Sequence, residues 1–351
     1  MIDHELYMSR CIELAKFGAG NVAPNPMVGA VLVYDDRIIG EGLHEKYGEA
    51  HAEVNCIKSV SETNRQFISS STLYVSLEPC SHFGKTPPCA DLIVEHKIPH
   101  IVIGCRDSFE KVNGTGIEKL LAAGIKVDVG ILENDCRILN KRFFTFHPKK
   151  RPYIILKWAQ SQDGFIAGEN STTTKISNGY TDKLVHQWRS EEAAILVGAN
   201  TVRIDNPNLT TRNWIGNHPV RIIIDEQLSL PKNSIVLDGK VETIIINRKK
   251  HYYESQKRFH KIEEDVAIID GIMECLYQSQ LNSVIIEGGA KTLQLFIDAG
   301  LWDEARIITN TTLYLNKGLK GPLLSHQNLH SSFNIFSDRV DFFLNNSNDA
   351  L

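Results

Sequence analysis

The sequence lacks the features that would point to a membrane, a secretory route or a nucleic acid. It contains no run of about 18 apolar residues, so we expect no membrane-spanning helix. Residues 1–5 lack the basic and apolar regions of a signal peptide. The formal net charge of -4 offers no basic excess for binding a nucleic acid. We therefore predict a cytoplasmic protein that acts on a small molecule, without a nucleic-acid or membrane partner.

Cysteine is too scarce to form a disulfide framework. Seven cysteines, an odd number, are spread over 351 residues, which is not the pattern of a small disulfide-bonded secreted domain. We assign a chemical role to Cys80 and Cys89. The other five are expected to be buried thiols: Cys11, Cys56, Cys105, Cys136 and Cys275.

The length and composition predict two globular domains. A chain of 351 residues is too long for one average domain, and its hydrophobic fraction of 42% is ordinary for globular proteins. The composition changes near residue 148, where the basic, proline-flanked segment 147–152 follows the aromatic cluster 143–146. We therefore predict a first domain of residues 1–147 and a second of residues 148–351.

The first domain contains three side chains that suit a zinc ion. His51, Cys80 and Cys89 offer one imidazole and two thiolates, which fit tetrahedral Zn²⁺ with one coordination position left open. Zinc lowers the pKa of a water in the open position to about 7, so a hydroxide nucleophile exists at neutral pH. Glu53 is close enough in sequence to carry protons between that nucleophile and a leaving group. A structural zinc site usually has four protein ligands and no acid, so we favour catalysis.

The two segments that carry these ligands have start signals for helices. His51 and Glu53 can face one site only if a helix begins between them, and residues 50–59 read as a helix with acids near its N-terminus. Cys80 follows a predicted strand over 72–77 and Pro79, which suits the start of a helix. A cysteine at a helix start is biased toward the thiolate.

The remaining elements of the first domain alternate between helices and strands. A helix is expected from Asp3 to about Phe17, followed by two strands that turn at Asp35-Asp36. These two strands cover residues 28–34 and 38–42, and the other predicted elements are a helix at 90–96 and a strand at 101–104.

His51-Ala52-Glu53, followed by Pro79-Cys80 and a second cysteine, resembles the zinc-dependent nucleoside and nucleotide deaminase superfamily. Eight residues, rather than two, separate the cysteines here. That longer insert, together with Pro24-Asn25-Pro26-Met27-Val28-Gly29, resembles the deaminase half of the RibD family of bacterial riboflavin biosynthesis proteins. The resemblance implies a cytidine-deaminase-like, three-layer αβα domain. It also implies hydrolytic deamination of 2,5-diamino-6-ribosylamino-4(3H)-pyrimidinone 5′-phosphate.

The same resemblance implies a set of substrate contacts in the first domain. Asn25 would otherwise be a turn residue between prolines, but in such proteins it contacts the pyrimidine. His44, Lys85 and Thr86 match positions that help to hold the substrate, and Lys85 beside Thr86 suits its phosphate. Asp107 matches the aspartate of a further family motif and is expected to contact the substrate. In the same motif this chain has Phe109 where the family has an asparagine, so the hydrogen bonds of that amide are lost.

Beyond residue 148 the pattern predicts a largely parallel sheet that is covered on both faces. Continuous apolar, β-branched runs alternate with amphipathic helical stretches, which is typical of buried parallel strands. From about Leu329 the chain becomes polar, and we expect its end to fray. The predicted strands are 153–156, 195–197, 220–224, 243–246, 266–269, 284–286 and 307–308, and the predicted helices include 182–190 and 291–299.

A glycine turn in this half suits a phosphate. Gly288 and Gly289 lie between a predicted strand and helix, where backbone N–H groups and the helix dipole can hold an anion. The G-x-G-x-x-G fingerprint is absent, and a plain chain reversal remains an alternative. Together with segments 157–164, 198–202 and 205–212, the turn resembles the RibD reductase domain. This implies a dihydrofolate-reductase-like α/β fold that uses NADPH to reduce the ribosyl group to ribityl.

The resemblance also implies ligand contacts in the second domain. Arg189 and Arg212 suit a phosphate because a guanidinium offers two parallel donors, whereas Lys175 lies where some relatives have a stacking tryptophan. NADPH contacts are expected from Ala159, Lys175, Thr201, Asp205, Gly289, Ala290, Lys291, Thr292, Leu293, Gln294 and Leu295. Substrate contacts are expected from Thr173, Arg189, Leu209, Arg212 and Glu287.

Two further expectations follow from the resemblance. The family is usually oligomeric through its reductase domain, so a homo-oligomer is expected. The alternatives are a tRNA-type or DNA deaminase fused to a reductase-like module, which would need a basic, aromatic-lined groove, and a binding protein without catalysis.

Overall fold

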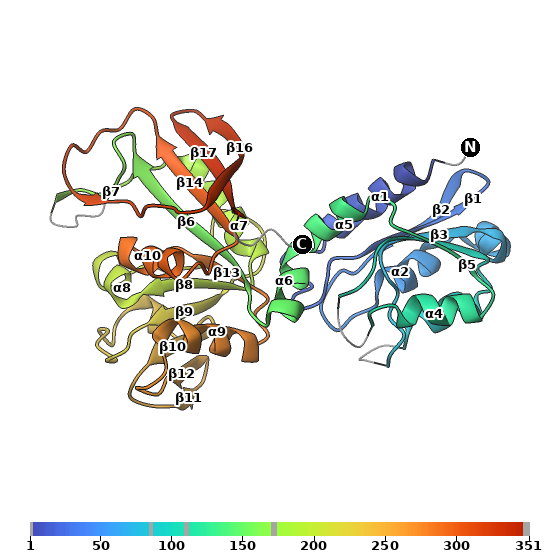
Figure 1. The fold of residues 1–351 in the computed structure, drawn as a ribbon, viewed down its shortest axis with the longest axis horizontal. Coiled ribbons are helices and arrows are strands. Elements are labelled where there is room, and N and C mark those ends of the chain that lie inside the picture. Colours follow the sequence, from blue (N-terminus) through green and yellow to red (C-terminus); the bar gives the residue numbers. More distant parts are fainter. Residues whose placement is uncertain (1–2, 84–86, 109–111, 170–173, 347–351) are drawn as a thin grey trace. The chain divides into compact units, whose positions relative to one another are not determined.

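The computed structural model describes residues 3–83, 87–108, 112–169 and 174–346. The chain divides into two compact units, Met1–Lys150 and Arg151–Leu351 (Figure 1). The predicted boundary between residues 147 and 148 lies inside helix α6 (Lys141–Lys149), which contains Pro148 near its C-terminal end. No helix among the described residues is long and apolar enough to cross a membrane.

Five described strands of the first unit form one mixed sheet in the order β2-β1-β3-β4-β5. The first strand pairs antiparallel with its two neighbours, and the third, fourth and fifth run parallel. The hairpin between the first two strands turns at Asp35 and Asp36, both with the left-handed φ that such tight turns need. The strands are β1 (Gly29–Tyr34), β2 (Arg37–Leu43), β3 (Thr72–Leu77), β4 (His100–Cys105) and β5 (Lys126–Val129).

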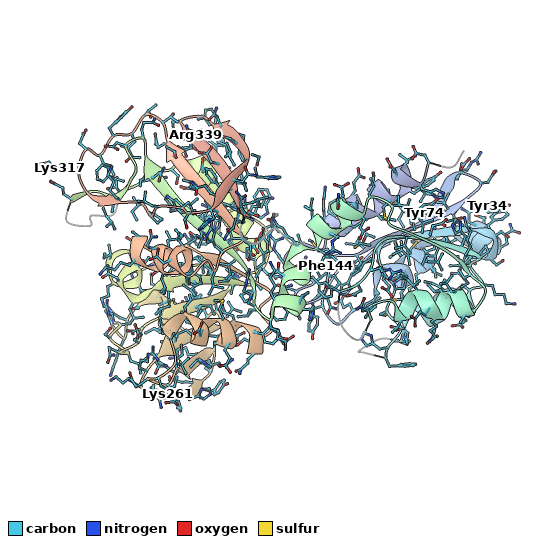
Figure 2. The ribbon with its side chains drawn as sticks, in the orientation of Figure 1. Tyr34, Tyr74, Phe144, Lys261, Lys317 and Arg339 are labelled. Carbon is cyan, nitrogen blue, oxygen red and sulfur yellow. The ribbon has the colours of Figure 1, made fainter. Side chains whose placement is uncertain are left out.

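Helices cover both faces of this sheet, so the first unit has three layers, αβα. One hydrophobic cluster joins one sheet face to α1 and α5, and a second joins the other face to α2, α3 and α4 (Figure 1). Tyr74 of β3 is fully buried against the first helix, where its ring lies 5.0 Å from that of Tyr7 (Figure 2). The helices are α1 (His4–Lys16), α2 (Ala52–Ser59), α3 (Cys89–Glu95), α4 (Thr115–Ala122) and α5 (Glu133–Leu139), with a 3₁₀ segment at Glu62–Ser70.

Local signals explain where two of these helices begin. The Asp3 carboxylate accepts a hydrogen bond from Leu6 N–H at 3.2 Å and caps α1, as predicted. The expected helix start at Cys80 is wrong. The helix begins at Cys89 instead, with Pro88 as its N-cap, and the Cys80 carbonyl accepts a bond from Ala90 N–H at 3.1 Å. Cys80 therefore lies in front of α3, on the loop that follows β3.

The second unit is built on a sheet of ten described strands, whose inner members run parallel as the sequence predicts. Their order is β11-β12-β10-β9-β8-β13-β6-β14-β17-β16, and a separate pair joins β7 to β15. The strands are β6 (Tyr153–Ser161), β7 (Phe165–Ala167), β8 (Ala194–Gly198), β9 (Val220–Ile224), β10 (Thr243–Asn247), β11 (Tyr252–Glu254), β12 (Lys257–Lys261), β13 (Ser283–Ile286), β14 (Glu304–Asn310), β15 (Leu319–Lys320), β16 (Gln327–Ile335) and β17 (Asp338–Asn345).

Two hydrophobic clusters lie on the opposite faces of the ten-stranded sheet. One contains residues of α9 and α10, and the other contains residues of α7 and α8. The helices are α7 (Gly179–Glu191), α8 (Ala199–Asp205), α9 (Ile268–Gln278) and α10 (Ala290–Asp298), with a 3₁₀ turn at Ile235–Leu237.

One prediction for this unit is wrong. The apolar run 266–269 is not a strand, because α9 begins at Ile268, and Ile272, Cys275 and Leu276 bury one helical face. The sequence reading also missed the antiparallel pair β16 and β17, which the polar stretch near the end of the chain forms. Residues 347–351 lie outside the described part of the chain.

Candidate active sites

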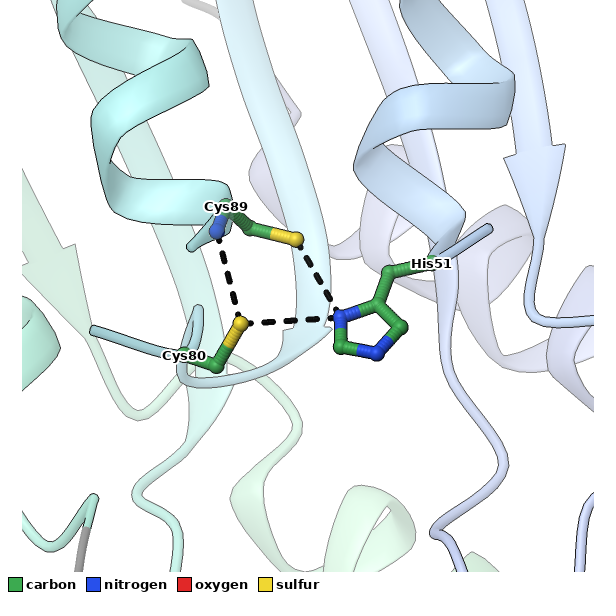
Figure 3. Close-up of side chains that lie close together, drawn as sticks. All are labelled: His51, Cys80 and Cys89. Atoms are coloured by element: carbon green, nitrogen blue, oxygen red, sulfur yellow. Dashed lines mark hydrogen bonds between the residues drawn. The ribbon is translucent and has the colours of Figure 1, made fainter. Parts of the chain in front are cut away.

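The structure brings the three predicted metal ligands together in the first unit. The Nδ1 atom of His51 lies 3.5 Å from the Sγ atom of Cys80 and 3.3 Å from that of Cys89. The three side chains point toward one another from the N-terminus of α2, the loop after β3 and the start of α3 (Figure 3). Zinc bonds of about 2.0–2.3 Å at tetrahedral angles place a nitrogen and a sulfur ligand roughly 3.5 Å apart, so the cluster fits zinc.

The charges of the two thiols also suit a cation. Hydrogen bonds from the Cys89 thiol and from His51 lower the pKa of Cys80 to about 4, although burial opposes this. The Cys89 backbone N–H adds a further bond to the Cys80 sulfur at 3.3 Å. The pKa of Cys89 is raised, because its thiol proton is shared with Cys80 and because it is buried. The protein alone thus favours one thiolate, and a divalent cation would balance a second.

Glu53 lies beside this cluster, in the first turn of α2. Only 3% of its surface is exposed, and its carboxyl interacts with both His51 and Cys89. Burial raises the pKa of Glu53 above its ordinary value, and the nearby His51 partly opposes the shift. His51 is the N-cap residue of α2, so the helix begins between the two residues, as the sequence predicts.

Asn25 and His44 are also brought to this cluster. The His44 ring lies edge-on to that of His51, with the ring centroids 5.3 Å apart. Its Nδ1 atom lies 3.0 Å from the Ala50 carbonyl and therefore carries the proton, so Nε2 accepts the Asn25 amide hydrogen at 3.2 Å. Burial lowers the pKa of His44, which keeps the ring neutral. The Asn25 oxygen is then the acceptor that this side chain would offer to a ligand.

Two residues that the sequence reading missed hold the loops around the cluster. Glu78 is 3% exposed, and its carboxylate accepts backbone hydrogen bonds from Asp107 and from three residues at the start of α4, at 3.1–3.3 Å. The Asp107 loop is thereby tied to the segment that carries Cys80. Asn140 clamps the backbone of Met27 through two bonds of 2.8 Å. For Glu78, the sequence did offer a signal, which is a carboxylate directly after an apolar strand. For Asn140, no neighbouring residue in the sequence indicates its role.

Three of the predicted contacts lie outside the described residues. They are Lys85, Thr86 and Thr173.

The second unit contains a buried group of charges at the end of β13. The Glu287 carboxylate accepts two hydrogen bonds from the Arg189 guanidinium, at 2.7 and 2.8 Å, and a third from Lys157 Nζ at 3.2 Å. The three side chains are between 8% and 13% exposed. Burial alone would raise the pKa of Glu287, but Arg189 and Lys157 hold it well below its usual range.

Arg212 lies next to this group. Partial desolvation by its neighbours and the nearby Arg189 guanidinium lower the pKa of Arg212, although much of its side chain is exposed. The preceding residues form a tight bend, in which Leu209 is buried with a left-handed φ of 53°. The predicted substrate contacts Arg189, Leu209, Arg212 and Glu287 therefore come together, and two of them are cations that suit a phosphate.

The N-termini of two helices meet at the ends of the neighbouring strands β8 and β13. Gly198 is the N-cap of α8 and Gly289 that of α10, and Gly289 N–H donates to the Thr201 hydroxyl at 3.2 Å. A Cβ atom on Gly198 would lie 2.7 Å from the Thr292 hydroxyl, so a larger residue there would force the Thr292 side chain to move. Figure 1 shows the two helices side by side. This arrangement suits the phosphates of a dinucleotide.

The other predicted cofactor contacts differ in how they are placed. Leu293 is fully buried in the core, so its side chain faces away from a ligand on the surface. Lys175 is exposed and pairs with Asp182 of α7 at 3.3 Å. Ala159 lies half-buried on β6, and Asp205 is exposed at the end of α8. Ala290, Lys291, Gln294 and Leu295 belong to α10.

Comparisons with known proteins match both units. Residues 1–105 match the family described as cytidine and deoxycytidylate deaminase zinc-binding region, and residues 152–313 match the RibD C-terminal domain. The riboflavin biosynthesis protein RibD of Aquifex aeolicus is 37% identical over 95% of this chain and 94% of its own length. That of Bacillus amyloliquefaciens is 40% identical over 86% of this chain and 82% of its own length.

A solved structure covers almost the whole chain. It is a diaminohydroxyphosphoribosylaminopyrimidine deaminase/5-amino-6-(5-phosphoribosylamino)uracil reductase from Thermotoga maritima, which is 37% identical to this chain and superposes with a TM-score of 0.88. The match covers 97% of this chain and 98% of that one. The chain therefore belongs to the RibD family of riboflavin biosynthesis proteins, and it is a bifunctional enzyme in which a zinc-dependent deaminase precedes an NADPH-dependent reductase.

Proposed function

We propose that the first unit deaminates 2,5-diamino-6-ribosylamino-4(3H)-pyrimidinone 5′-phosphate and that the second unit reduces the ribosyl group of the product. The final product is then 5-amino-6-(5-phospho-D-ribitylamino)uracil. The activities in the name of the Thermotoga maritima structure support these substrates. The observation that carries the proposal is the His51, Cys80 and Cys89 cluster, whose ligand atoms lie within 4.8 Å of one another beside a buried Glu53. A tRNA-type or DNA deaminase is not favoured, because the family matches cover both halves of the chain.

In the deaminase, the residues of the chain hold the pyrimidine and move protons. Bound zinc supplies an activated water at neutral pH. The buried Glu53 carboxylate beside the three ligands would take up one proton on the nucleophile side and return one to the departing ammonia. Asn25 accepts a hydrogen bond from the pyrimidine, and its amide is oriented by His44. We carry over the substrate roles of His44, Lys85, Thr86 and Asp107 from the family resemblance.

In the reductase, the chain binds and orients two ligands. NADPH supplies the hydride when bound. The converging N-termini of α8 and α10 would hold its phosphates, with contacts from Thr201 and from the start of α10. Arg189 and Arg212 would hold the phosphate of the substrate, with Glu287 fixing the Arg189 guanidinium. Ala159, Lys175, Asp205, Thr173 and Leu209 keep the cofactor and substrate roles that the resemblance implies.

Removing the metal is expected to separate the two activities. A chelator that strips zinc should abolish ammonia release from the diaminopyrimidine, because the activated water is lost. NADPH oxidation with the deaminated intermediate should continue, because the second unit contains none of the three ligands. Ammonia release, NADPH absorbance and elemental analysis measure this, and zinc should restore deamination. Undiminished ammonia release from protein shown to be metal-free would refute the zinc mechanism.

We propose that the enzyme is a homo-oligomer that associates through β16. This strand ends the ten-stranded sheet, all of its residues but the last are exposed, and Leu329 and Phe333 are 54% and 42% exposed. Such an edge invites pairing with a second copy. Phe333→Lys should lower the mass measured by light scattering toward that of a monomer. Phe17→Lys in the first unit, where Phe17 is 73% exposed, is the matched control. A monomeric wild-type protein would rule this interface out.

We further propose that the enzyme works in the cytoplasm. None of the seven cysteines, all of which lie in the described part of the chain, forms a disulfide, which suits a reducing compartment. Recovery of the native enzyme from a secreted or membrane fraction would contradict this.

A further inference from the structure

His186 lies next to Arg189 and Arg212, the proposed phosphate ligands of the reductase, and has no part in the proposed reaction. It is three residues before Arg189 on α7, so both side chains lie on the same face of that helix. Only 5% of His186 is exposed. Its Nδ1 atom accepts a hydrogen bond from the backbone N–H of Arg212 at 3.1 Å, and Arg189 donates to the Thr210 carbonyl at 3.5 Å. Two side chains of one helix thus hold the backbone of the loop that carries Arg212.

The bond to Arg212 requires a neutral imidazole. A backbone N–H can only donate, so Nδ1 must be unprotonated and Nε2 must carry the hydrogen. A doubly protonated ring would place an N–H group against an N–H group. The charged groups that face His186 are Arg189 on its own helix, Arg212 on the loop and Glu287 after β13. Burial, followed by the two arginines, lowers the pKa of His186, and Glu287 opposes this shift.

The loop needs this support for two reasons. Leu209 has a left-handed φ of 53°, which is an unfavourable backbone conformation for a residue with a bulky side chain. Such a conformation persists only where the surrounding structure holds the backbone in place. Arg212 is exposed to solvent and lies near a second guanidinium, whose like charge repels it. The bonds from His186 and Arg189 to this loop fix the backbone from which the Arg212 side chain extends.

We propose that His186 is a positioning residue of the reductase: its neutral imidazole holds the backbone of Arg212 so that Arg189 and Arg212 form a ready phosphate clamp. The inference rests on the proposed role of these two arginines. It predicts that His186 acts on the binding of the phosphorylated substrate and not on the hydride-transfer step.

Steady-state kinetics of the full-length, zinc-loaded enzyme test the proposal. His186→Ala should raise the KM for the deaminated, phosphorylated substrate by about tenfold, the effect expected of one lost hydrogen bond that positions a charged group, and should leave kcat within about twofold. His186→Asn places a carbonyl oxygen near the position of Nδ1 and should return KM to within about threefold of wild type. The KM for NADPH and the deaminase activity of the first unit serve as internal controls. An unchanged KM in His186→Ala would overturn the proposal.

The pH profile gives an independent test that does not depend on His186→Ala folding. The wild-type KM for the substrate should rise as the pH falls through the lowered pKa of His186, because the ring then accepts a proton and loses its bond to the Arg212 N–H. The substrate phosphate also titrates near pH 6 and will affect the KM of both enzymes equally. His186→Asn cannot take up a proton at residue 186, so any difference between the two pH profiles comes from that residue. The wild-type rise should therefore be steeper than that of His186→Asn, and identical profiles would reject the inference.

Arg212→Ala separates this inference from the function on which it rests. If Arg212→Ala leaves KM unchanged, the phosphate clamp itself is wrong. If Arg212→Ala raises KM while His186→Ala does not, the clamp stands and the role of His186 is wrong. If both raise KM and the double variant is no worse than Arg212→Ala alone, the two residues act through one contact, as proposed.

Discussion

Replacing Glu53 by glutamine is expected to lower the kcat of deamination by about 10²–10⁴-fold, which is the usual contribution of a general acid–base group. Glutamine fills nearly the same buried volume but cannot take up and return a proton. The three metal ligands are untouched, so zinc content should stay at one per chain. Ammonia release and elemental analysis measure the two quantities. Reduction of the deaminated intermediate should proceed at the wild-type rate, because the second unit forms a separate compact body.

The matched control is Glu49→Gln, which lies four residues before Glu53 in sequence, outside α2, with a side chain that is 56% exposed and forms an ion pair with Lys46 at 3.8 Å. It should deaminate normally. A Glu53→Gln enzyme that works at the wild-type rate would show that another group carries the proton. Loss of zinc from the variant would instead mean that Glu53 supports the metal site.

Glu287→Gln should destabilise the second unit strongly. Removing one partner from a buried ion pair costs about 3–5 kcal/mol, because the remaining charges are left uncompensated. Glu287 is the carboxylate that balances both Arg189 and Lys157, and each of these side chains is at most 13% exposed. Because glutamine keeps one acceptor oxygen, we expect a value near the lower end of this range. Denaturant unfolding monitored in the second unit measures it, and reductase activity should fall as the arginine loses its orientation.

The effect of Glu287→Gln should depend on pH in one direction. The folded-state pKa of Glu287 lies below its ordinary value of 4.5. Its stabilisation is therefore fully present above that value and is lost as pH falls toward the folded-state pKa. The gap in unfolding free energy between wild type and variant should narrow as the pH is lowered below about 4.5.

Glu263→Gln is the matched control for this test. Glu263 pairs with Lys261 on the surface and is 64% exposed, so its loss should cost less than about 1 kcal/mol. The proposed buried charge network would be refuted if the loss of unfolding free energy in Glu287→Gln were as small as that in Glu263→Gln. It would also be refuted if that loss did not change with pH.

Much of the first unit was predictable because its signals are local. Asp3 caps α1, Asp35 and Asp36 turn the hairpin, and His51 stands where α2 begins. Each of these depends on contacts between residues a few positions apart. The metal ligands were found for a related reason: imidazole and thiolate side chains have few other uses in this combination, so the residue types point to zinc before their positions are known.

The errors come from patterns that are ambiguous or silent at short range. A four-residue apolar run such as 266–269 fits a strand or the start of a helix, and only the later burial of Ile272 and Leu276 decides for the helix. Strand β16 is exposed along almost all its length, so it shows no alternation of apolar and polar residues. Its partner β17 supplies the ladder that makes it a strand.

The sequence by itself predicted the proposed ligand set, the acid proposed beside it and the alternation of strands and helices, since these predictions follow from residue chemistry and short-range periodicity. Only the tertiary structure decided which polar side chains hold the sites in shape. Asn140 clamps Met27 across 113 residues, Glu78 binds the start of α4, and His186 accepts from Arg212 across 26. Hydrogen bonds between distant segments leave no pattern along the chain, because a partner is selected by where the fold brings it and not by its place in the sequence.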